Sequence, residues 1–386
     1  MNQISKSSDS YHDLPLAGLV VLELGTIIAG PFAGSLLADL GALVIKIEQP
    51  NQGDGLRNSG PVIDGVSIWW GVASRNKKCI SLDLKSPIGH QTFCHLIAKA
   101  DVLIENYRPG VLDRLDLSVQ KMHLMNSKLI VLSISGYGQD GINSQKPGFA
   151  TIAEALSGLS SLLGEPDGGP LLPPIALTDE VTALVGSFSA MIAIYHAKLT
   201  GQGQIVDIDL VDSVLQIMGP LPAAWDSLGY LQPRLGSSIP YSIPRGTYKC
   251  SDGVWVALSA SAETVAKRLI ETVGGGGDPR FTSFQSRFEN REALEELTSR
   301  WIGTRTSKEV IETIEAADAA IAPVYNMQQV IEDPHFIARK SFTKVDGILM
   351  QNLVARLSKT PGKIVSAGPK LGQHNQEIKR ELDEKK

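Results

Sequence analysis

The chain has 386 residues, of which 43% are hydrophobic and 20% charged, and it carries a formal charge of -5. This length exceeds the usual size of one domain, so we expect a globular protein with two domains. The charge excludes the strongly basic surface that nucleic-acid binding requires, and no uninterrupted apolar run of about 18 residues predicts a membrane-spanning helix.

The cysteines and the start of the chain indicate a cytoplasmic protein. Cys79, Cys94 and Cys250 form no CxxC pair, which is typical of a reducing compartment and argues against a disulfide scaffold. The first dozen residues are polar and predict neither a signal peptide nor a transit peptide. The histidines are scattered, and His90 and His95 have poor spacing for two ligands on one helix face, so no metal site is expected.

Strand and helix patterns alternate over the first 150 residues. The predicted strands span 20–24, 42–48, 79–84, 100–107 and 128–138, with helices over 32–42 and 87–99. Pro31 stands in the first turn of the first helix, where proline is favoured. This alternation predicts a parallel α/β sheet that binds its ligand at the carboxyl ends of the strands. The segment GTIIAG after the first strand matches neither GxGxxG nor a P-loop, which argues against a nicotinamide or nucleoside-triphosphate site.

Basic residues flank the third predicted strand and follow the fourth. The segment ENYRPGVLDRL places Arg108 and Arg114 close together, and guanidinium groups suit a phosphorylated ligand. With the RNKK segment at 75–78 and Lys85, these side chains could bind a polyanion. Solvated surface charge explains the same pattern equally well.

A long helix rich in small residues begins near Asp179 and is expected to end at Thr200-Gly201, with Thr178 as its N-cap. A carboxylate in the first turn of a helix is stabilised by the positive end of the helix dipole. Local sequence alone therefore favours a structural role for Asp179, and a catalytic role needs support from the rest of the chain.

The region over 226–330 changes character and predicts a smaller α+β domain. Residues 248–258 (YKCSDGVWVAL) predict a β-hairpin whose turn is Asp252-Gly253. Helical patterns follow around 262–273, 291–302 and 307–317.

Taken together, several stretches resemble the class III CoA-transferases, the family that includes formyl-CoA:oxalate and carnitine CoA-transferases. The resemblance extends from about residue 14 to 376. The matching stretches include LAGLVVLELGTIIAGPFAGSLLADLGALVIKIEQP, RNKKCISLDLKSPIG, ADVLIENYRPGVLDRL, KPGFATIAEALSGL, GEPDGGP, TGQGQIVDIDLVDSVL and APVYNMQQVIEDPHF. Each stretch alone is weak, whereas their order and spacing together are highly specific.

The resemblance implies a fold and an assembly. A Rossmann-like large domain with a parallel sheet would be built from both chain ends, residues 1–225 and 331–386, around the smaller α+β domain at 226–330. Two chains would form a homodimer whose subunits interlock like links.

The resemblance also implies the site. The family's nucleophile, an aspartate that opens a long helix, corresponds to Asp179. The stretch with Lys146 and Phe149 is expected to approach the pantetheine and the thioester. The matching positions for CoA contacts are Ala29, Leu82, Lys85, Asn106, Tyr107, Arg108 and Arg114.

Some positions depart from the family pattern. Phe149 and Ala150 stand where many members have Tyr-Asp, which predicts a more apolar acyl pocket. A racemase branch has histidine at the position of Phe149, and phenylalanine cannot carry a proton, so racemase chemistry is disfavoured. Formyl-CoA:oxalate members have Arg at the position of Gln49 and Gln at that of Ile28, which argues against oxalate or formate as the substrate.

The function implied by the resemblance is transfer of CoA from an acyl-CoA thioester to a free carboxylic acid through a covalent aspartyl intermediate. Coenzyme A would be a cosubstrate, with no permanently bound cofactor and no metal. The alternatives are an acyl-CoA racemase or isomerase of the same family and a non-catalytic CoA-binding protein. If Arg245 reaches the site, a dicarboxylate such as succinate becomes the expected acid.

Overall fold

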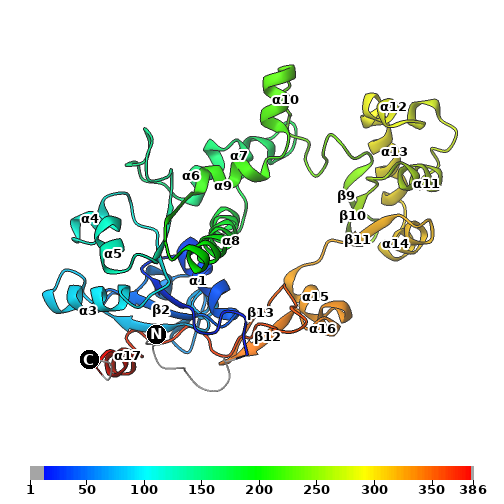
Figure 1. The fold of residues 1–386 in the computed structure, drawn as a ribbon. Helices are drawn as coiled ribbons and strands as arrows, with labels where there is room; N and C mark the ends of the chain where they lie inside the picture. Colours follow the sequence, from blue (N-terminus) through cyan, green and yellow to red (C-terminus); the bar gives the residue numbers. More distant parts are fainter. Residues whose placement is uncertain (1–12, 384–386) are drawn as a thin grey trace. The chain divides into compact units, whose positions relative to one another are not determined.

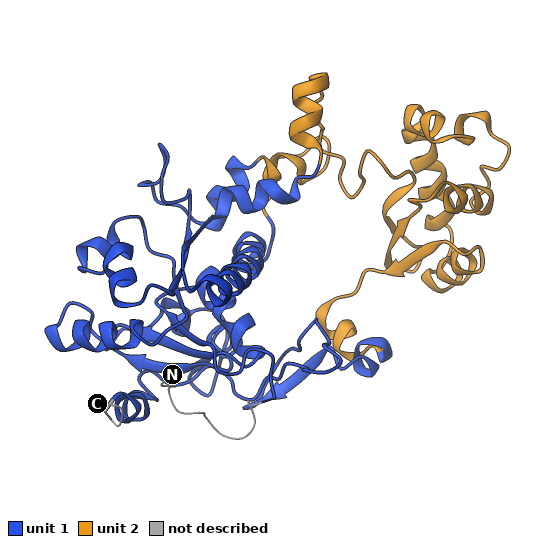
Figure 2. Ribbon diagram, in the orientation of Figure 1, with its two compact units in different colours: residues 1–157, 173–219, 334–386 blue, residues 158–172, 220–333 orange. Residues whose placement is uncertain are grey.

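The computed structural model describes residues 13–383 and divides into two compact units, coloured blue and orange in Figure 2. Unit 1 comprises Met1–Ser157, Pro173–Gly219 and Pro334–Lys386, and unit 2 comprises Gly158–Leu172 and Pro220–Asp333. The expected small domain at 226–330 falls within unit 2, which also takes the segment 158–172. This segment groups with unit 2 because the Arg234 guanidinium donates to the carbonyl oxygens of Glu165 at 3.3 Å and Gly168 at 2.7 Å.

Unit 1 is built on a six-stranded sheet in which all neighbouring strands are parallel. The strands are β1 (Val20–Glu23), β2 (Leu43–Glu48), β5 (Lys78–Ser81), β6 (Val102–Glu105), β7 (Ile130–Ser135) and β8 (Ile205–Asp209). Their spatial order is β5-β2-β1-β6-β7-β8. Along the chain this reads 3-2-1-4-5-6, the order of a doubly wound sheet, which reverses direction between β1 and β6.

Helices cover both faces of this sheet and form a hydrophobic core on each (Figure 1). One core combines alternate strand residues such as Val21 and Ile104 with α1 (Ala29–Asp39) and α8 (Leu177–Thr200). The other combines the intervening residues, such as Leu22 and Leu103, with α3 (Pro87–Ile97), α5 (Val119–Met125) and α17 (Asn375–Asp383). Strands buried on both faces explain the nearly continuous apolar runs in the sequence.

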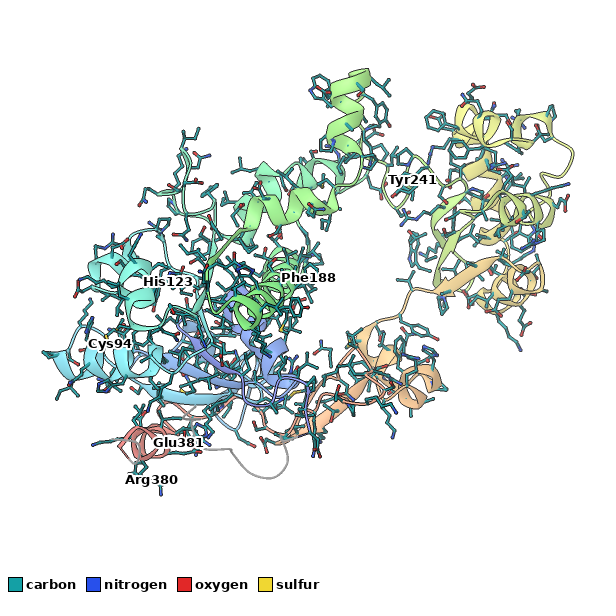
Figure 3. The ribbon with its side chains drawn as sticks, in the orientation of Figure 1. Cys94, His123, Phe188, Tyr241, Arg380 and Glu381 are labelled. Carbon is teal, nitrogen blue, oxygen red and sulfur yellow. The ribbon has the colours of Figure 1, made fainter. Side chains whose placement is uncertain are left out.

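The long helix α8 has two different sides. Its buried side consists largely of small residues, and Gly186 lies so close to the sheet that an added Cβ would be 3.5 Å from the side chain of Leu132. The opposite side carries large apolar residues that are each more than half exposed, with Phe188 near the middle (Figure 3). These are Leu184, Phe188, Ile192, Tyr195 and Leu199, which we call the α8 stripe.

By length and composition, α8 could also cross a membrane, although 44% of its most apolar window is buried within the protein. A core helix of a globular domain meets the same criteria, and α8 packs on α1 and on the sheet through its small residues. The helix therefore gives only weak support for a membrane span.

Unit 1 also contains two hairpins and several shorter helices. Two short hairpins pair β3 with β4 and β12 with β13. Their bounds are β3 (Val62–Ile63), β4 (Val66–Ser67), β12 (Phe342–Val345) and β13 (Ile348–Gln351). The helices are η1 (Gly55–Asn58), α2 (Ile68–Ala73), α4 (Val111–Arg114), α6 (Ala150–Leu156), α9 (Leu210–Ile217) and α16 (Pro334–Ala338).

Unit 2 contains a three-stranded antiparallel sheet in the order β11-β10-β9, with a hydrophobic core between the sheet and its helices. The strands are β9 (Arg245–Lys249), β10 (Trp255–Ser259) and β11 (Ala320–Pro323). The helices are α7 (Leu159–Leu162), α10 (Leu221–Leu228), α11 (Glu263–Thr272), η2 (Pro279–Phe281), α12 (Phe284–Glu289), α13 (Arg291–Gly303), α14 (Ser307–Ala316) and α15 (Met327–Glu332).

The sequence predicted five of the six parallel strands, the hairpin of β9 and β10, and the helices α11, α13 and α14. The prediction missed β8, an edge strand with the sequence IVDID whose side chains are only partly buried. Because acids alternate with apolar residues there, the segment lacks the continuous apolar run of the central strands.

Candidate active site

The loops after several parallel strands hold most of the predicted site residues. Ala29 begins α1 after β1, Asn106 and Tyr107 directly follow β6, and Phe149 precedes α6 after β7. Leu82 and Lys85 follow β5, Arg108 and Arg114 follow β6, and Lys146 follows β7. The carboxyl ends of parallel strands lie at one edge of a sheet, so the fold gathers these residues at the edge where doubly wound sheets bind ligands.

The loop between β1 and α1 is fastened at the point where the sheet reverses direction. The side chain of Asn106 accepts a hydrogen bond from the Thr26 N–H at 2.8 Å and donates one to the Thr26 carbonyl oxygen at 2.8 Å. The backbones of Gly25 and Gly30 approach so closely that a Cβ on either would lie 3.0 Å from the other's Cα. Asn106 thus fixes this loop in addition to any contact with a ligand.

Ile27 has a φ of 66°, a left-handed conformation that is rare for a β-branched residue. Its N–H donates to the Asp54 carboxylate at 3.1 Å. Buried Lys46 binds the same carboxylate at 2.8 Å and also donates to the Gly25 carbonyl oxygen. A buried ion pair therefore holds a strained loop in place, and such strain tends to occur at functional sites.

The charges of this ion pair support each other. Burial alone would raise the pKa of Asp54, but the charge of Lys46 and backbone hydrogen bonds outweigh this effect and lower it. Burial would likewise lower the pKa of Lys46, but the charges of Glu23 and Asp54 outweigh it and raise the value. Both groups are therefore held in their charged forms.

The loop after β6 combines a buried acid with exposed bases. Burial raises the pKa of Glu105 to about 7, and its carboxylate accepts a hydrogen bond from the Tyr107 N–H at 2.8 Å. Arg108 and Arg114 are exposed, as are Lys85 after β5 and Lys146 after β7. The two guanidiniums and two ammonium groups remain accessible to an anionic ligand.

The loop after β7 returns to its own strand before α6 begins. Gly136 and Gly148 meet so closely that an added Cβ on either would lie 2.7 Å from the other's Cα. This contact anchors the start of α6, where Phe149 is the N-cap residue and is 68% exposed. An apolar ring therefore lies exposed beside the helix that contacts α8.

Asp179 is the third residue of α8 and is partly buried. The helix ends as predicted, with Gly201 in a left-handed conformation, but the predicted N-cap is wrong. Ala176 occupies the N-cap position, and Thr178 lies inside the first turn. The hydroxyl of Thr178 donates instead to the carboxylate of Glu154 on α6, at 3.0 Å.

The surroundings of Asp179 are acidic. Burial, and then the charges of Glu154 and Glu180, raise its pKa to about 6. Among the described residues, no ion pair joins a cation to any of these three carboxylates. At neutral pH, Asp179 is thus mostly an ionised carboxylate that no cation neutralises, a suitable state for a nucleophile.

Sequence reasoning missed Glu154, Lys46 and Asp54. Glu154 lies within the quoted stretch KPGFATIAEALSGL, but an acid in a short helix resembles a solvated one, and only the packing of α6 on α8 reveals that it is buried. Lys46 stands in the run LVIKIE, and a charge inside an apolar strand was the signal that could have indicated a buried ion pair.

A hollow of about 570 Å³ lies on unit 2, and neither Asp179 nor any of the predicted CoA contacts lines it. It is lined by Ser259, Ser261, Ala262, Val265, Glu315, Asp318, Ala319 and Ala320. We do not assign the chemistry to this hollow, because it contains neither the candidate nucleophile nor any of the exposed bases.

Comparison with known proteins gives a consistent result. The model of CoA-transferase family III matches residues 16–375. A succinyl-CoA–D-citramalate CoA-transferase of Chloroflexus aurantiacus is 37% identical, with 95% of this chain and 94% of that protein covered. An acetyl-CoA:oxalate CoA-transferase of Acetobacter aceti is 30% identical, with 95% and 96% covered. A solved CAIB/BAIF family protein from Brucella suis has a TM-score of 0.86 at 30% identity, covering 96% of this chain and 100% of that one.

Proposed function

The chain belongs to CoA-transferase family III, as the sequence resemblance indicated, and we propose that Asp179 is the nucleophile through which it transfers CoA. The observation that carries this proposal is a partly buried carboxylate with acidic neighbours and a pKa raised to about 6. The helix dipole stabilises any first-turn acid, but Asp179 forms neither a cap hydrogen bond nor an ion pair among the described residues. Its surroundings suit a reactive group.

The reaction proceeds through two attacks at carbonyl carbons. The Asp179 carboxylate attacks the donor thioester, the C–S bond breaks, and CoA leaves as the thiolate, which gives a mixed anhydride. The thiolate then attacks the aspartyl carbonyl of the anhydride, the C–O bond breaks, and the donor acid leaves as a carboxylate. The acceptor carboxylate reverses both steps on the aspartyl-CoA thioester, and no net proton transfer is required.

We propose that CoA lies along the carboxyl edge of the unit 1 sheet. The proposed contacts are Ala29, Leu82, Lys85, Asn106, Tyr107, Arg108, Arg114, Lys146 and Phe149. The strands before these residues include β5 and β6, which are three strand spacings apart, about 14 Å, and β7 lies one strand further. This span and the exposed bases suit a long ligand with phosphates at one end and a thioester at the other. No permanently bound cofactor is needed.

The acids exchanged are proposed to include a dicarboxylate such as succinate. Relatives named as succinyl-CoA:citramalate and succinyl-CoA:glutarate CoA-transferases share 37% and 30% identity with the chain. The guanidinium of Arg245 on β9 has no ion-pair partner among the described residues. It is therefore free to bind the second carboxylate of a dicarboxylic acid. Succinyl-CoA turnover that is unaffected by Arg245→Ala would remove this role for Arg245.

We also propose a cytoplasmic homodimer that does not act at a membrane. The α8 stripe supports a second copy as the occupant, because five large apolar side chains at helical spacing seldom remain open to water. Interlocking of the subunits is what the family resemblance implies. Light scattering on the native chain and on Phe188→Glu tests this assembly, and a native monomer would contradict it.

The decisive experiment is intact-protein mass spectrometry after incubation with succinyl-CoA and other acyl-CoAs, with hydroxylamine as the trap. Hydroxylamine converts an aspartyl-CoA thioester or anhydride to a hydroxamate on Asp179 and releases CoA or the donor acid. The native chain should gain this adduct, and Asp179→Ala should not. Binding of CoA without any adduct on the native chain would refute the aspartyl mechanism.

A further inference from the structure

A second carboxylate contacts the first turn of α8, the turn that carries the candidate nucleophile. Glu154 on α6 is only 3% exposed, and Thr178, the residue before Asp179, is fully buried. The Thr178 hydroxyl donates to Glu154 at 3.0 Å, while the Thr178 carbonyl oxygen accepts a bond from the Thr182 hydroxyl at 2.7 Å. The side chain and the backbone of Thr178 are therefore both engaged, and the first turn of α8 is tied to α6.

This placement of Glu154 is costly for the fold. A buried carboxylate normally has a cationic partner, because removal of a charge from water is unfavourable. Glu154 has a hydroxyl donor in Thr178, and no ion pair to it occurs among the described residues. The positive end of the α8 dipole offsets part of the cost. A neutral glutamine could accept the same hydrogen bond, so the hydrogen bond alone does not account for an acid here.

We infer that Glu154 is a positioning residue for the CoA-transfer reaction: it holds the first turn of α8 through Thr178, and its charge favours the covalent, uncharged form of Asp179 over the free carboxylate. This inference rests on the proposed function. In the net half-reaction, the Asp179 carboxylate and the acyl-CoA become aspartyl-CoA and the free donor carboxylate. The negative charge leaves residue 179 with the departing acid, so the repulsion from Glu154 is relieved when the intermediate forms.

The charges around Asp179 agree with this role. Glu154 lies on α6, and Glu180 follows Asp179 in the first turn of α8. The charges of both raise the pKa of Asp179, after the larger effect of burial. The acids on the other elements that pack against α8 have no such effect on Asp179. These are Asp39 on α1, Asp207 and Asp209 on β8, and Asp212 on α9. Among the acids on neighbouring elements, Glu154 is therefore the one whose charge raises the pKa of Asp179.

Glu154→Gln tests the inference, since it keeps the acceptor and removes the charge. The acid limb of the pH profile of kcat/KM should move to lower pH by about one unit. The steady-state level of trapped aspartyl-CoA should fall roughly tenfold, because one pKa unit corresponds to a tenfold change in such an equilibrium. Glu180→Gln should shift the limb less. Glu296→Gln, which removes an exposed acid of unit 2, should change neither quantity.

The outcomes separate the two proposals. If the native chain forms no adduct, the proposed function fails. If the native chain forms the adduct and Glu154→Gln leaves both the acid limb and the adduct level unchanged, only the role of Glu154 fails; a larger shift in Glu180→Gln than in Glu154→Gln has the same meaning.

A second pair of variants covers the case in which Glu154→Gln does not fold. Thr178→Ser keeps the hydroxyl donor, and Thr178→Val removes it at nearly constant volume. With both proteins folded by circular dichroism, the valine variant should have a kcat at least fivefold below that of the serine variant at similar KM. Equal kcat values would overturn the positioning role.

Discussion

Two groups of buried or partly buried acids in unit 1 have opposite surroundings. Beneath the β1–α1 loop, Glu23, Glu48 and Asp54 each form an ion pair with a lysine or an arginine. Around the first turn of α8, Glu154 and Asp179 have no such partner among the described residues. The pKa values of Glu48 and Asp54 are lowered, although burial opposes this, whereas that of Asp179 is raised to about 6.

We interpret this difference as one between acids that hold the fold and acids that are proposed to take part in the reaction. The paired group forms an extended network in which the guanidinium of Arg57 binds Glu48 at 2.6 Å and lies 3.7 Å above the Trp70 ring. Such a network is well suited to hold the left-handed Ile27 loop in one conformation. The unpaired group leaves a carboxylate whose charge is poorly compensated, which suits a group that must lose its charge on reaction. Substitutions in the two groups should therefore have different consequences.

The largest effect is expected for Asp179→Asn. Loss of a covalent nucleophile should reduce kcat by about 10⁴-fold or more. Stability should remain unchanged or rise, because the variant removes a poorly compensated charge. Steady-state turnover of succinyl-CoA and thermal melting measure the two quantities. A large fall in melting temperature together with residual activity would place Asp179 among the structural acids.

Asp54→Asn should have the converse effect. It leaves the buried ammonium of Lys46 without one of its two carboxylates and weakens the acceptor of the Ile27 N–H. Removal of one partner of a buried ion pair costs about 3–5 kcal/mol, so the free energy of unfolding should fall by that order. Urea denaturation measures this loss. A fully stable Asp54→Asn protein that loses only kcat would show that the loop network serves the chemistry more than the fold.

The same contrast explains how far the sequence could be interpreted. Strands buried on both faces have continuous apolar runs, so five of the six parallel strands and their carboxyl-end loops were predictable. The proposal that Asp179 is the nucleophile came from the family resemblance, because a first-turn acid on its own looks structural. The role of Glu154 depends on the contact between α6 and α8, and local sequence carries no signal of such a contact. The misplaced N-cap has the same origin, since the Thr178 hydroxyl has a better partner in tertiary structure than in its own helix.

The pH dependence should distinguish the two groups in one protein. The folded-state pKa of Asp179, about 6, is higher than the ordinary value of 3.8, so protonation favours folding, and this contribution is lost as the pH rises through 6. The pKa of Asp54 is lowered, so its contribution is present above 3.8 and is lost only as the pH falls through that lowered pKa. If Asp179 is the nucleophile, activity requires its ionised form and should fall about tenfold per pH unit below 6.

Between pH 6 and 5 the protein should therefore lose activity while its fold persists. Activity assays and far-ultraviolet circular dichroism on the same samples, with recovery of activity after return to pH 7, measure this separation. If unfolding accompanies the loss of activity, the acid limb reports the stability of the fold and not the ionisation of Asp179.

The smallest effect is expected when an exposed base is substituted. The comparison of paired and unpaired groups then also includes the cations. Lys46 and Lys77 are buried and paired with acids, whereas Arg108 and Arg114 are exposed. Arg114→Ala should raise the KM for the acyl-CoA roughly fivefold, equivalent to about 1 kcal/mol for an exposed ionic contact, and kcat and the melting temperature should stay unchanged. The KM effect should shrink as salt is added, because exposed charges are screened. A KM that is insensitive to both Arg114→Ala and salt would move the phosphate contacts to other residues along the sheet edge, since an exposed guanidinium that binds a phosphate must respond to ionic strength.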